Sequence, residues 1–137
     1  MYSVVKRLEF CYAHRLLDYK GPCQHLHGHN AVAEIEIKAD LLDSQSMVCD
    51  FNLIKERLKS WIDSNLDHKS ILNSRDPLVK ALRDMGEPVF EMNSNPTAET
   101  IARLIFDYAR EQKLTVTSVR LWETPSACAT YTSTPTT

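Results

Sequence analysis

Residues 23–39 read CQHLHGHNAVAEIEIKA, a stretch that joins several histidines to an alternating apolar segment. In its second half, Ala33, Ile35 and Ile37 face one way and charged residues face the other. Because side chains alternate across a β-strand, residues 31–39 predict a strand with one buried and one solvated face. In its first half, an extended backbone would point His27 and His29 to the same side.

Segments before and after this strand predict the other elements of the first two thirds of the chain. Residues 2–10 alternate as a half-buried strand, and residues 11–30 contain several turn-forming residues and predict a long functional loop. Asp50 is a typical N-cap for a helix over residues 51–66, which carries one apolar stripe. A short helix over residues 77–85 should stop at Gly86.

The last third predicts a second long helix and two further strands. The helix follows Asn95-Pro96-Thr97 and carries Glu99 in its first turn, where a carboxylate suits the helix dipole. Residues 116–123 and 127–132 alternate as strands, and residues 133–137 should form a frayed tail. This order predicts an α+β fold, with a four-stranded antiparallel sheet and two long helices on one face. Residues 1–132 are expected to form a single domain.

Composition excludes several classes of function. The chain has 137 residues, of which 43% are hydrophobic and 25% are charged, and its formal net charge is -2. It has no apolar run of the roughly 20 residues needed to span a bilayer, and no export signal, so we expect a cytoplasmic protein. A slightly acidic chain without a basic cluster is not expected to bind nucleic acid. The four cysteines are scattered, which argues against a structural thiolate zinc site.

The histidines favour a catalytic metal site. Four of the five lie between residues 14 and 29, and three imidazoles with an open position are typical of catalytic zinc. His27 and His29 form a natural pair, and either His14 or His25 can supply the third ligand. Spacing mildly favours His14, because three histidines two apart on a straight strand would spread over roughly 13 Å at about 3.3 Å per residue.

Five motifs, in order along most of the chain, resemble those of the 6-pyruvoyl-tetrahydropterin synthase family. They are AHRL at 13–16, Cys23 followed by HGH at 27–29, LDH at 66–68, PTAE at 96–99 and WET at 122–124. The three residues between Cys23 and the HGH motif resemble the bacterial branch that produces 6-carboxy-tetrahydropterin in the queuosine pathway. By this resemblance, His14, His27 and His29 bind Zn2+, which acts as a Lewis acid and template.

The same resemblance implies roles for the other motif residues. Cys23 would be the general base, activated by Asp67 and His68. Glu123 would anchor the pterin ring through two hydrogen bonds, and Thr97 would be a further contact to that ring. The reaction implied is conversion of 7,8-dihydroneopterin triphosphate to 6-carboxy-5,6,7,8-tetrahydropterin, with release of acetaldehyde and triphosphate.

The resemblance also implies an assembly. In the tunnelling fold of this family, the sheets of three subunits close into a barrel and two trimers stack, so we expect a homohexamer with sites between subunits. Three basic residues near the motifs are candidates for binding the triphosphate: Arg15, Lys20 and Lys69. Two alternatives stay open: a pyruvoyl-type or side-chain-cleaving relative acting on a related dihydropterin, and a non-catalytic zinc-binding or pterin-binding protein.

Overall fold

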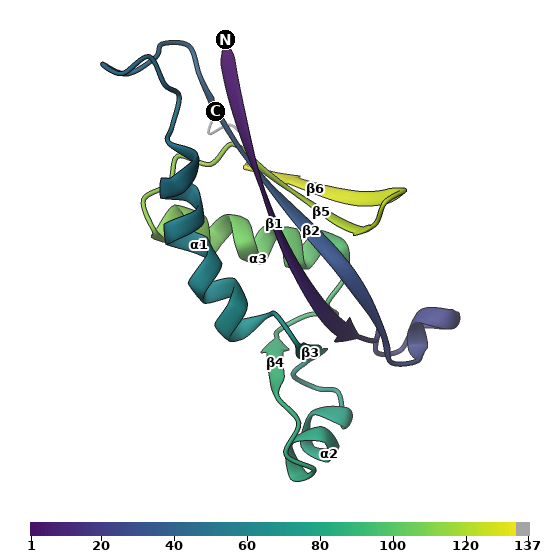
Figure 1. Cartoon of the computed structure of the whole chain (residues 1–137). Coiled ribbons are helices and arrows are strands. Elements are labelled where there is room, and N and C mark those ends of the chain that lie inside the picture. The colour runs from purple at the N-terminus through teal and green to yellow at the C-terminus, as the bar shows by residue number, and fades with distance from the viewer. Residues whose placement is uncertain (134–137) are drawn as a thin grey trace.

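A single curved sheet of six strands runs through the protein, in the spatial order β4-β3-β1-β2-β5-β6 (Figure 1). The computed structural model describes residues 1–133, so residues 134–137 of the predicted tail lie outside the described part of the chain. The strands are β1 (Tyr2–His14), β2 (His27–Ala39), β3 (Lys69–Asn73), β4 (Val89–Met92), β5 (Ser118–Thr124) and β6 (Ala127–Thr132). The helices are α1 (Phe51–Asn65), α2 (Leu78–Asp84) and α3 (Ala98–Glu111), with a short 3-10 turn η1 (Pro22–Gln24).

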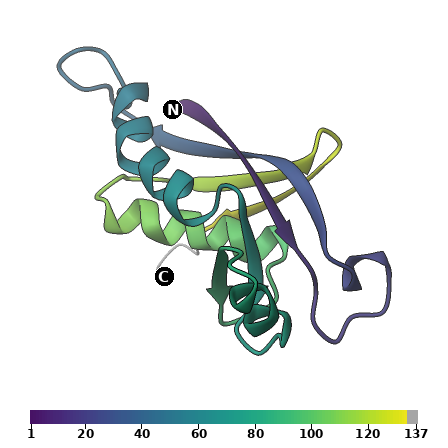
Figure 2. The ribbon, with the colours of Figure 1, turned by 60° about the horizontal axis from the view of Figure 1, so that its bottom comes forward.

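The first two strands form a long hairpin that extends further than the sequence predicts. They pair antiparallel from Tyr2 with Ala39 to His14 with His27, so the connecting loop covers only residues 15–26. That loop and η1 project beyond the end of the sheet (Figure 2). The predicted loop over residues 11–30 is therefore wrong at both ends. Gly28 belongs to β2 instead, where a Cβ atom would lie 3.2 Å from the carbonyl oxygen of Tyr12.

The sheet is mixed, and the prediction of a four-stranded antiparallel sheet is wrong. The four predicted strands are present as β1, β2, β5 and β6, and their pairings are antiparallel. Two short strands, β3 and β4, add to the free edge of β1, and both pairings on that side are parallel. The short helix α2 connects β3 to β4, as a crossover between parallel strands requires.

Two long helices cover one face of the sheet, as predicted. The side chain of Asp50 caps α1 by accepting from the backbone N–H of Asn52, and the hydroxyl of Thr97 caps α3 by accepting from Thr100. The inward side chains of β1, β2 and β5 pack with both helices in one core, which includes Ile35, Ile54, Ile105 and Leu121. None of the helices in residues 1–133 is long and apolar enough to cross a membrane.

Candidate functional site

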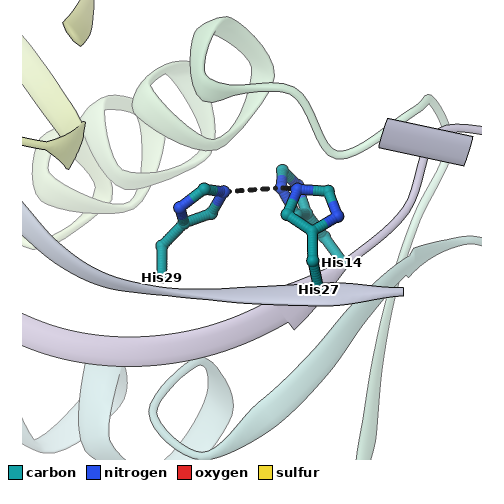
Figure 3. Close-up of side chains that lie close together, drawn as sticks. All are labelled: His14, His27 and His29. Carbon is teal, nitrogen blue, oxygen red and sulfur yellow. Dashed lines mark hydrogen bonds between the residues drawn. The ribbon is translucent and has the colours of Figure 1, made fainter. Parts of the chain in front are cut away.

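Three imidazoles from the β1–β2 hairpin point toward one another (Figure 3). His14 is the last residue of β1, directly opposite His27, and His29 follows on the same face of β2. The Nε2 atom of His14 lies 3.0 Å from Nε2 of His27 and 3.1 Å from Nε2 of His29. The structure thus gathers His14, His27 and His29, and it leaves the side chain of His25 outside this group.

Backbone carbonyls fix the orientation of two of these rings. Nδ1 of His14 donates a hydrogen bond of 2.7 Å to the carbonyl of Pro96, just before α3, and Nδ1 of His27 donates one of 2.7 Å to the carbonyl of His25. A proton on Nδ1 leaves the Nε2 lone pair free to bind a cation. Burial lowers the pKa of His14 from its ordinary value, even though the Pro96 contact raises it, and this favours the neutral, ligating form.

The arrangement fits a divalent cation. Nitrogen ligands on a tetrahedral zinc ion, with bonds of about 2.0–2.1 Å, stand about 3.3 Å from one another. The two Nε2 separations at His14 are within a few tenths of an ångström of that value. Three neutral imidazoles with converging lone pairs repel one another unless a proton or a cation lies between them, so the cluster is suited to hold a metal ion with one position left open.

Glu123 and Tyr12 lie beside this cluster. Oε2 of Glu123 is 3.6 Å from Nε2 of His29, and the hydroxyl of Tyr12 donates to Oε1 over 3.4 Å. Burial raises the pKa of Tyr12, and the neighbouring carboxylate of Glu123 raises it further, so the phenol stays a donor. Sequence reasoning missed Tyr12, because within a strand it is indistinguishable from a core aromatic residue.

Asp67 and His68 form a pair at the turn between α1 and β3. Nδ1 of His68 donates to Oδ2 of Asp67 over 2.8 Å, and it lies 3.5 Å from Sγ of Cys11. Desolvation raises the pKa of Asp67, but hydrogen bonds from the Cys11 N–H and from His68 outweigh it, and the pKa falls below its ordinary value. Asp67 is therefore ionised at neutral pH.

The structure does not bring Cys23 to this pair within one chain. Cys23 lies in η1, in the projecting loop, whereas the His68 ring contacts Cys11 and Asp67. Cys11 is half-buried, and no local sequence signal reveals its contacts, since its partners are 56 and 57 residues away in the chain.

Two further candidate residues have structural partners of their own. The hydroxyl of Thr97, predicted to contact a ring, caps α3. The guanidinium of Arg15, a candidate for triphosphate binding, forms two hydrogen bonds to the buried carboxylate of Asp76, at 2.8 and 2.5 Å. Lys69 donates to the carbonyl of Asp67. Arg15, one of the three basic residues considered for triphosphate binding, is thus already held in an ion pair with Asp76.

Comparison with known proteins decides the family. A sequence model described as "6-pyruvoyl tetrahydropterin synthase" matches residues 3–134. The chain belongs to the 6-pyruvoyl tetrahydropterin synthase family. Within this family, proteins named 6-carboxy-5,6,7,8-tetrahydropterin synthase are similar to it. One from Rickettsia bellii is 41% identical over 92% of this chain and 96% of its own length, and one from Haemophilus influenzae is 35% identical over 96% and 99%.

Two solved structures share the fold. The 6-pyruvoyl tetrahydropterin synthase of Caenorhabditis elegans superposes with a TM-score of 0.71, at 21% identity over 97% of this chain and 96% of its own. An uncharacterized protein from Wolinella succinogenes superposes with a TM-score of 0.78, at 25% identity over 96% and 97%. The fold of this chain is therefore shared with both proteins over nearly their whole length.

Proposed function

We propose that this chain is a 6-carboxy-5,6,7,8-tetrahydropterin synthase, a lyase that converts 7,8-dihydroneopterin triphosphate in the queuosine pathway and releases acetaldehyde and triphosphate. The convergence of three Nε2 atoms on one point carries the proposal, because it supplies the metal site that this chemistry needs. The names of relatives 35–41% identical over most of the chain support the choice of reaction. Residues 1–132 would form the single catalytic domain, which we expect in the cytoplasm.

His14, His27 and His29 would hold the metal, which we propose is Zn2+. A bound zinc ion would lower the pKa of the side-chain hydroxyls of the substrate and polarise the carbonyl that forms from them. The carbonyls of Pro96 and His25 would keep the His14 and His27 rings in the ligating tautomer. The half-buried sheet end beside Tyr12 would exclude part of the solvent from this position.

Glu123 would bind the pterin ring at the metal. Its carboxylate can accept two parallel hydrogen bonds from the ring N3–H and the 2-amino group, a bidentate match. The carboxylate is 26% exposed and lies 3.6 Å from Nε2 of His29, so a ring bound to it would present its side chain toward the cluster. Thr97, which lies next to Pro96, would contribute a further contact to the ring.

Cys23, Asp67 and His68 would move the protons. Asp67 accepts from Nδ1 of His68, which leaves Nε2 of His68 as a base, and the ring is 77% exposed and available to a group outside the chain. Alternation along β1 places Cys11 on the opposite face from Tyr12 and His14, so His68, which contacts Cys11, lies on the face away from the metal cluster. We infer that His68 acts on Cys23 of another subunit.

This inference agrees with an assembly of three sheets into a barrel and two stacked trimers, a homohexamer. The edge strands β4 and β6 leave unpaired backbone groups, which pairing with other subunits would satisfy. The face of the sheet away from the helices carries a charged group, in which Glu34 accepts from Arg7 over 2.6 Å and from Arg120 over 3.1 Å. A polar face of this kind suits the inner wall of a barrel.

Product analysis tests the reaction. Purified protein incubated with 7,8-dihydroneopterin triphosphate should yield 6-carboxy-5,6,7,8-tetrahydropterin and acetaldehyde, measured by mass spectrometry. A 6-pyruvoyl product would assign the pyruvoyl-type reaction instead. Absence of any turnover by metal-loaded protein would favour a non-catalytic zinc-binding or pterin-binding protein.

Replacement of the proposed base separates enzyme from binding protein. Cys23→Ala should abolish turnover and leave the metal content unchanged, because the thiol is proposed to move a proton and not to bind zinc. Cys49→Ser is the matched control, since Cys49 is a half-buried thiol before α1 that lies outside the motifs and whose Sγ donates to the carbonyl of Asp50. If Cys23→Ala kept full activity, the role of Cys23 would be wrong.

A further inference from the structure

The loop over residues 15–26, which carries Cys23, is attached to the rest of the protein near its root. It projects beyond the end of the sheet (Figure 2). Within the described part of the chain, the hydrogen bonds of residues 18–24 all end inside this loop. One of them joins the N–H of Leu16 to the carbonyl of Cys23 over 2.9 Å. The position of the thiol is therefore set by the contacts that hold the first residues of the loop.

The side chain of Asn95 holds the root of this loop. Its Oδ1 accepts from the N–H of Leu17 over 3.0 Å, and its Nδ2 donates to the carbonyl of Leu17 over 2.9 Å. One amide side chain thus satisfies both backbone groups of Leu17, as a neighbouring strand would. Asn95 is 78 residues further along the chain, in the connector between β4 and α3. The contact therefore ties the loop to a distant and ordered part of the protein.

Asn95 is itself fixed by its neighbours. Asn73, the last residue of β3, is 3% exposed, and its Nδ2 donates to Oδ1 of Asn95 over 3.2 Å. The backbone carbonyl of Asn95 accepts from the hydroxyl of Thr100 over 2.7 Å and from the N–H of Thr97 over 2.9 Å. Because Oδ1 accepts from two donors, a flipped amide would set its NH2 group against both of them. The orientation of the Asn95 amide is therefore determined.

We propose that Asn95 is a positioning residue for proton transfer, which acts through the backbone of Leu16 and Leu17 to place the thiol of Cys23. This inference rests on the proposed function, in which Cys23 acts together with groups of another subunit. A thiol on a projecting loop has to keep its place relative to a different chain. An error of about 1 Å in such a placement can cost up to about 100-fold in rate.

The connector that contains Asn95 also orients the three-histidine cluster, which consists of His14, His27 and His29. Pro96 follows Asn95, and its carbonyl accepts from Nδ1 of His14. The connector thus holds the loop with a side chain and a metal-binding ring with a backbone oxygen. Removal of the Asn95 side chain should therefore loosen the loop and leave the carbonyl of Pro96 in place.

Steady-state kinetics of the full chain test this role. Asn95→Ala should lower kcat by about 10- to 100-fold and leave KM and metal content near their wild-type values, because loop placement affects proton transfer and not binding of the ring or the metal. Asn93→Ala is the matched control, since Asn93 is an exposed residue of the same connector, and it should behave like the wild type. An unchanged kcat or a loss of metal in Asn95→Ala would overturn the proposal.

Mixed oligomers separate an effect on Cys23 from a general loss of structure. Asn95→Ala co-expressed with Cys23→Ala should gain nothing over Asn95→Ala alone, because neither chain then carries an intact and well-placed loop. Asn95→Ala co-expressed with His68→Ala should recover roughly a quarter of wild-type activity per site, because one chain supplies the loop and the other supplies His68. Recovery in the first mixture, or none in the second, would contradict an action through Cys23.

Hydrogen exchange supplies a readout that needs no turnover. In Asn95→Ala, the peptide over residues 15–26 should exchange its amide protons at least about tenfold faster, because the N–H of Leu17 loses its acceptor, while the strands exchange as in the wild type. If Asn95→Ala fails to fold, Asn95→Asp takes its place, since its carboxylate cannot donate to the carbonyl of Leu17. Unchanged exchange in the loop would refute the role of Asn95, whereas a wild type without turnover would refute the proposed reaction.

Discussion

His27 and His25 show how two neighbouring histidines can have different parts in one site. The ring of His27 offers Nε2 to the cluster, whereas His25 contributes only its backbone carbonyl, which accepts from His27. Replacing each histidine by alanine therefore distinguishes the residue that binds with its ring from the residue that contributes only its backbone.

We predict that His27→Ala removes the metal of the three-histidine cluster and His25→Ala does not. Loss of one of three imidazoles leaves two ligands, too few to compete with water and chelators, while the His25 carbonyl survives its substitution. Metal content by inductively coupled plasma mass spectrometry measures the difference. Equal metal content in the two histidine variants would contradict the prediction.

The ion pair of Arg15 and Asp76 gives folding a dependence on pH. Two hydrogen bonds from Arg15 hold the pKa of Asp76 below its ordinary value despite desolvation, and Asp76 also accepts from the N–H of Leu78 at the start of α2. A carboxyl whose folded pKa is lowered binds its proton more readily in the unfolded state. Its stabilisation is therefore present above the ordinary pKa of aspartate and is lost as the pH falls through the folded pKa.

We predict that Asp76→Asn lowers the free energy of unfolding by about 3 kcal/mol at pH 7, because the side chain is fully buried and the variant leaves Arg15 without its partner. The gap between wild type and variant should narrow in acid, where the wild-type carboxyl is protonated. Urea unfolding at pH 7 and below pH 4 measures it. A gap that stays constant would show that the pair is not the source of the pH dependence.

At the scale of single residues, the sequence predicted part of the candidate site. The pattern of histidines indicates a metal and names His27 and His29, but the choice of His14 over His25 depended on the family resemblance. The sequence did not reveal the contacts of Tyr12 and Cys11, because the side chain that each of them meets is more than fifty residues away in the chain. Periodicity assigns a side chain to a face of an element and says nothing of which distant residue meets it there.

Among the helices in residues 1–133, α3 is linked to the three-histidine cluster through the residue before its cap. Its cap, Thr97, follows Pro96, whose carbonyl accepts from His14. The start of the helix thus fixes the position of a backbone oxygen that orients a ligand.

We predict that Thr97→Ala lowers the free energy of unfolding by about 1 kcal/mol, the usual cost of losing an N-cap hydroxyl. Thr97→Ser keeps the hydroxyl and should stay close to the wild type. Urea unfolding midpoints of the two variants measure the effect. If serine destabilised the protein as much as alanine, packing of the threonine methyl group and not the cap would be responsible.

The elements that the sequence predicted best are those that are long and half-buried. The apolar stripe of α1 repeats over several helical turns, and the alternation of apolar and polar residues in β2 repeats over several pleats. Each repeat is long enough to identify its element. The strands β3 and β4 have five and four residues, too few for a period, and their pairing to β1 and to each other is decided by tertiary contacts. The last four residues of β1 and the first four of β2 were not predicted as strand, because apolar and polar residues do not alternate clearly there.

For the whole molecule, the proposal that one active site takes His27 from one subunit and His68 from another has a direct test. His27 belongs to the three-histidine cluster and His68 lies on the opposite face of β1, so a site that uses both needs two chains. Two inactive variants can then complement each other.

We predict that His27→Ala and His68→Ala are each inactive, and that mixed oligomers made by co-expression recover roughly a quarter of wild-type activity per site, the share of sites that receive both intact residues by chance. Co-purification through two different tags isolates the mixed oligomers, and turnover is then measured. Mixed oligomers without activity would indicate that His27 and His68 act within the same chain.

The spacing of three between Cys11 and His14 limits how β1 can change in length. An odd interval sends the two side chains to opposite sides of the ribbon, and every position between Tyr2 and His14 is paired with β2. Deletion of one residue at this end of the strand would turn one side chain around and bring thiol and imidazole to the same side. A change of one residue in the turn at 43–46 moves no such partner, so natural or engineered length variation should be far better tolerated there.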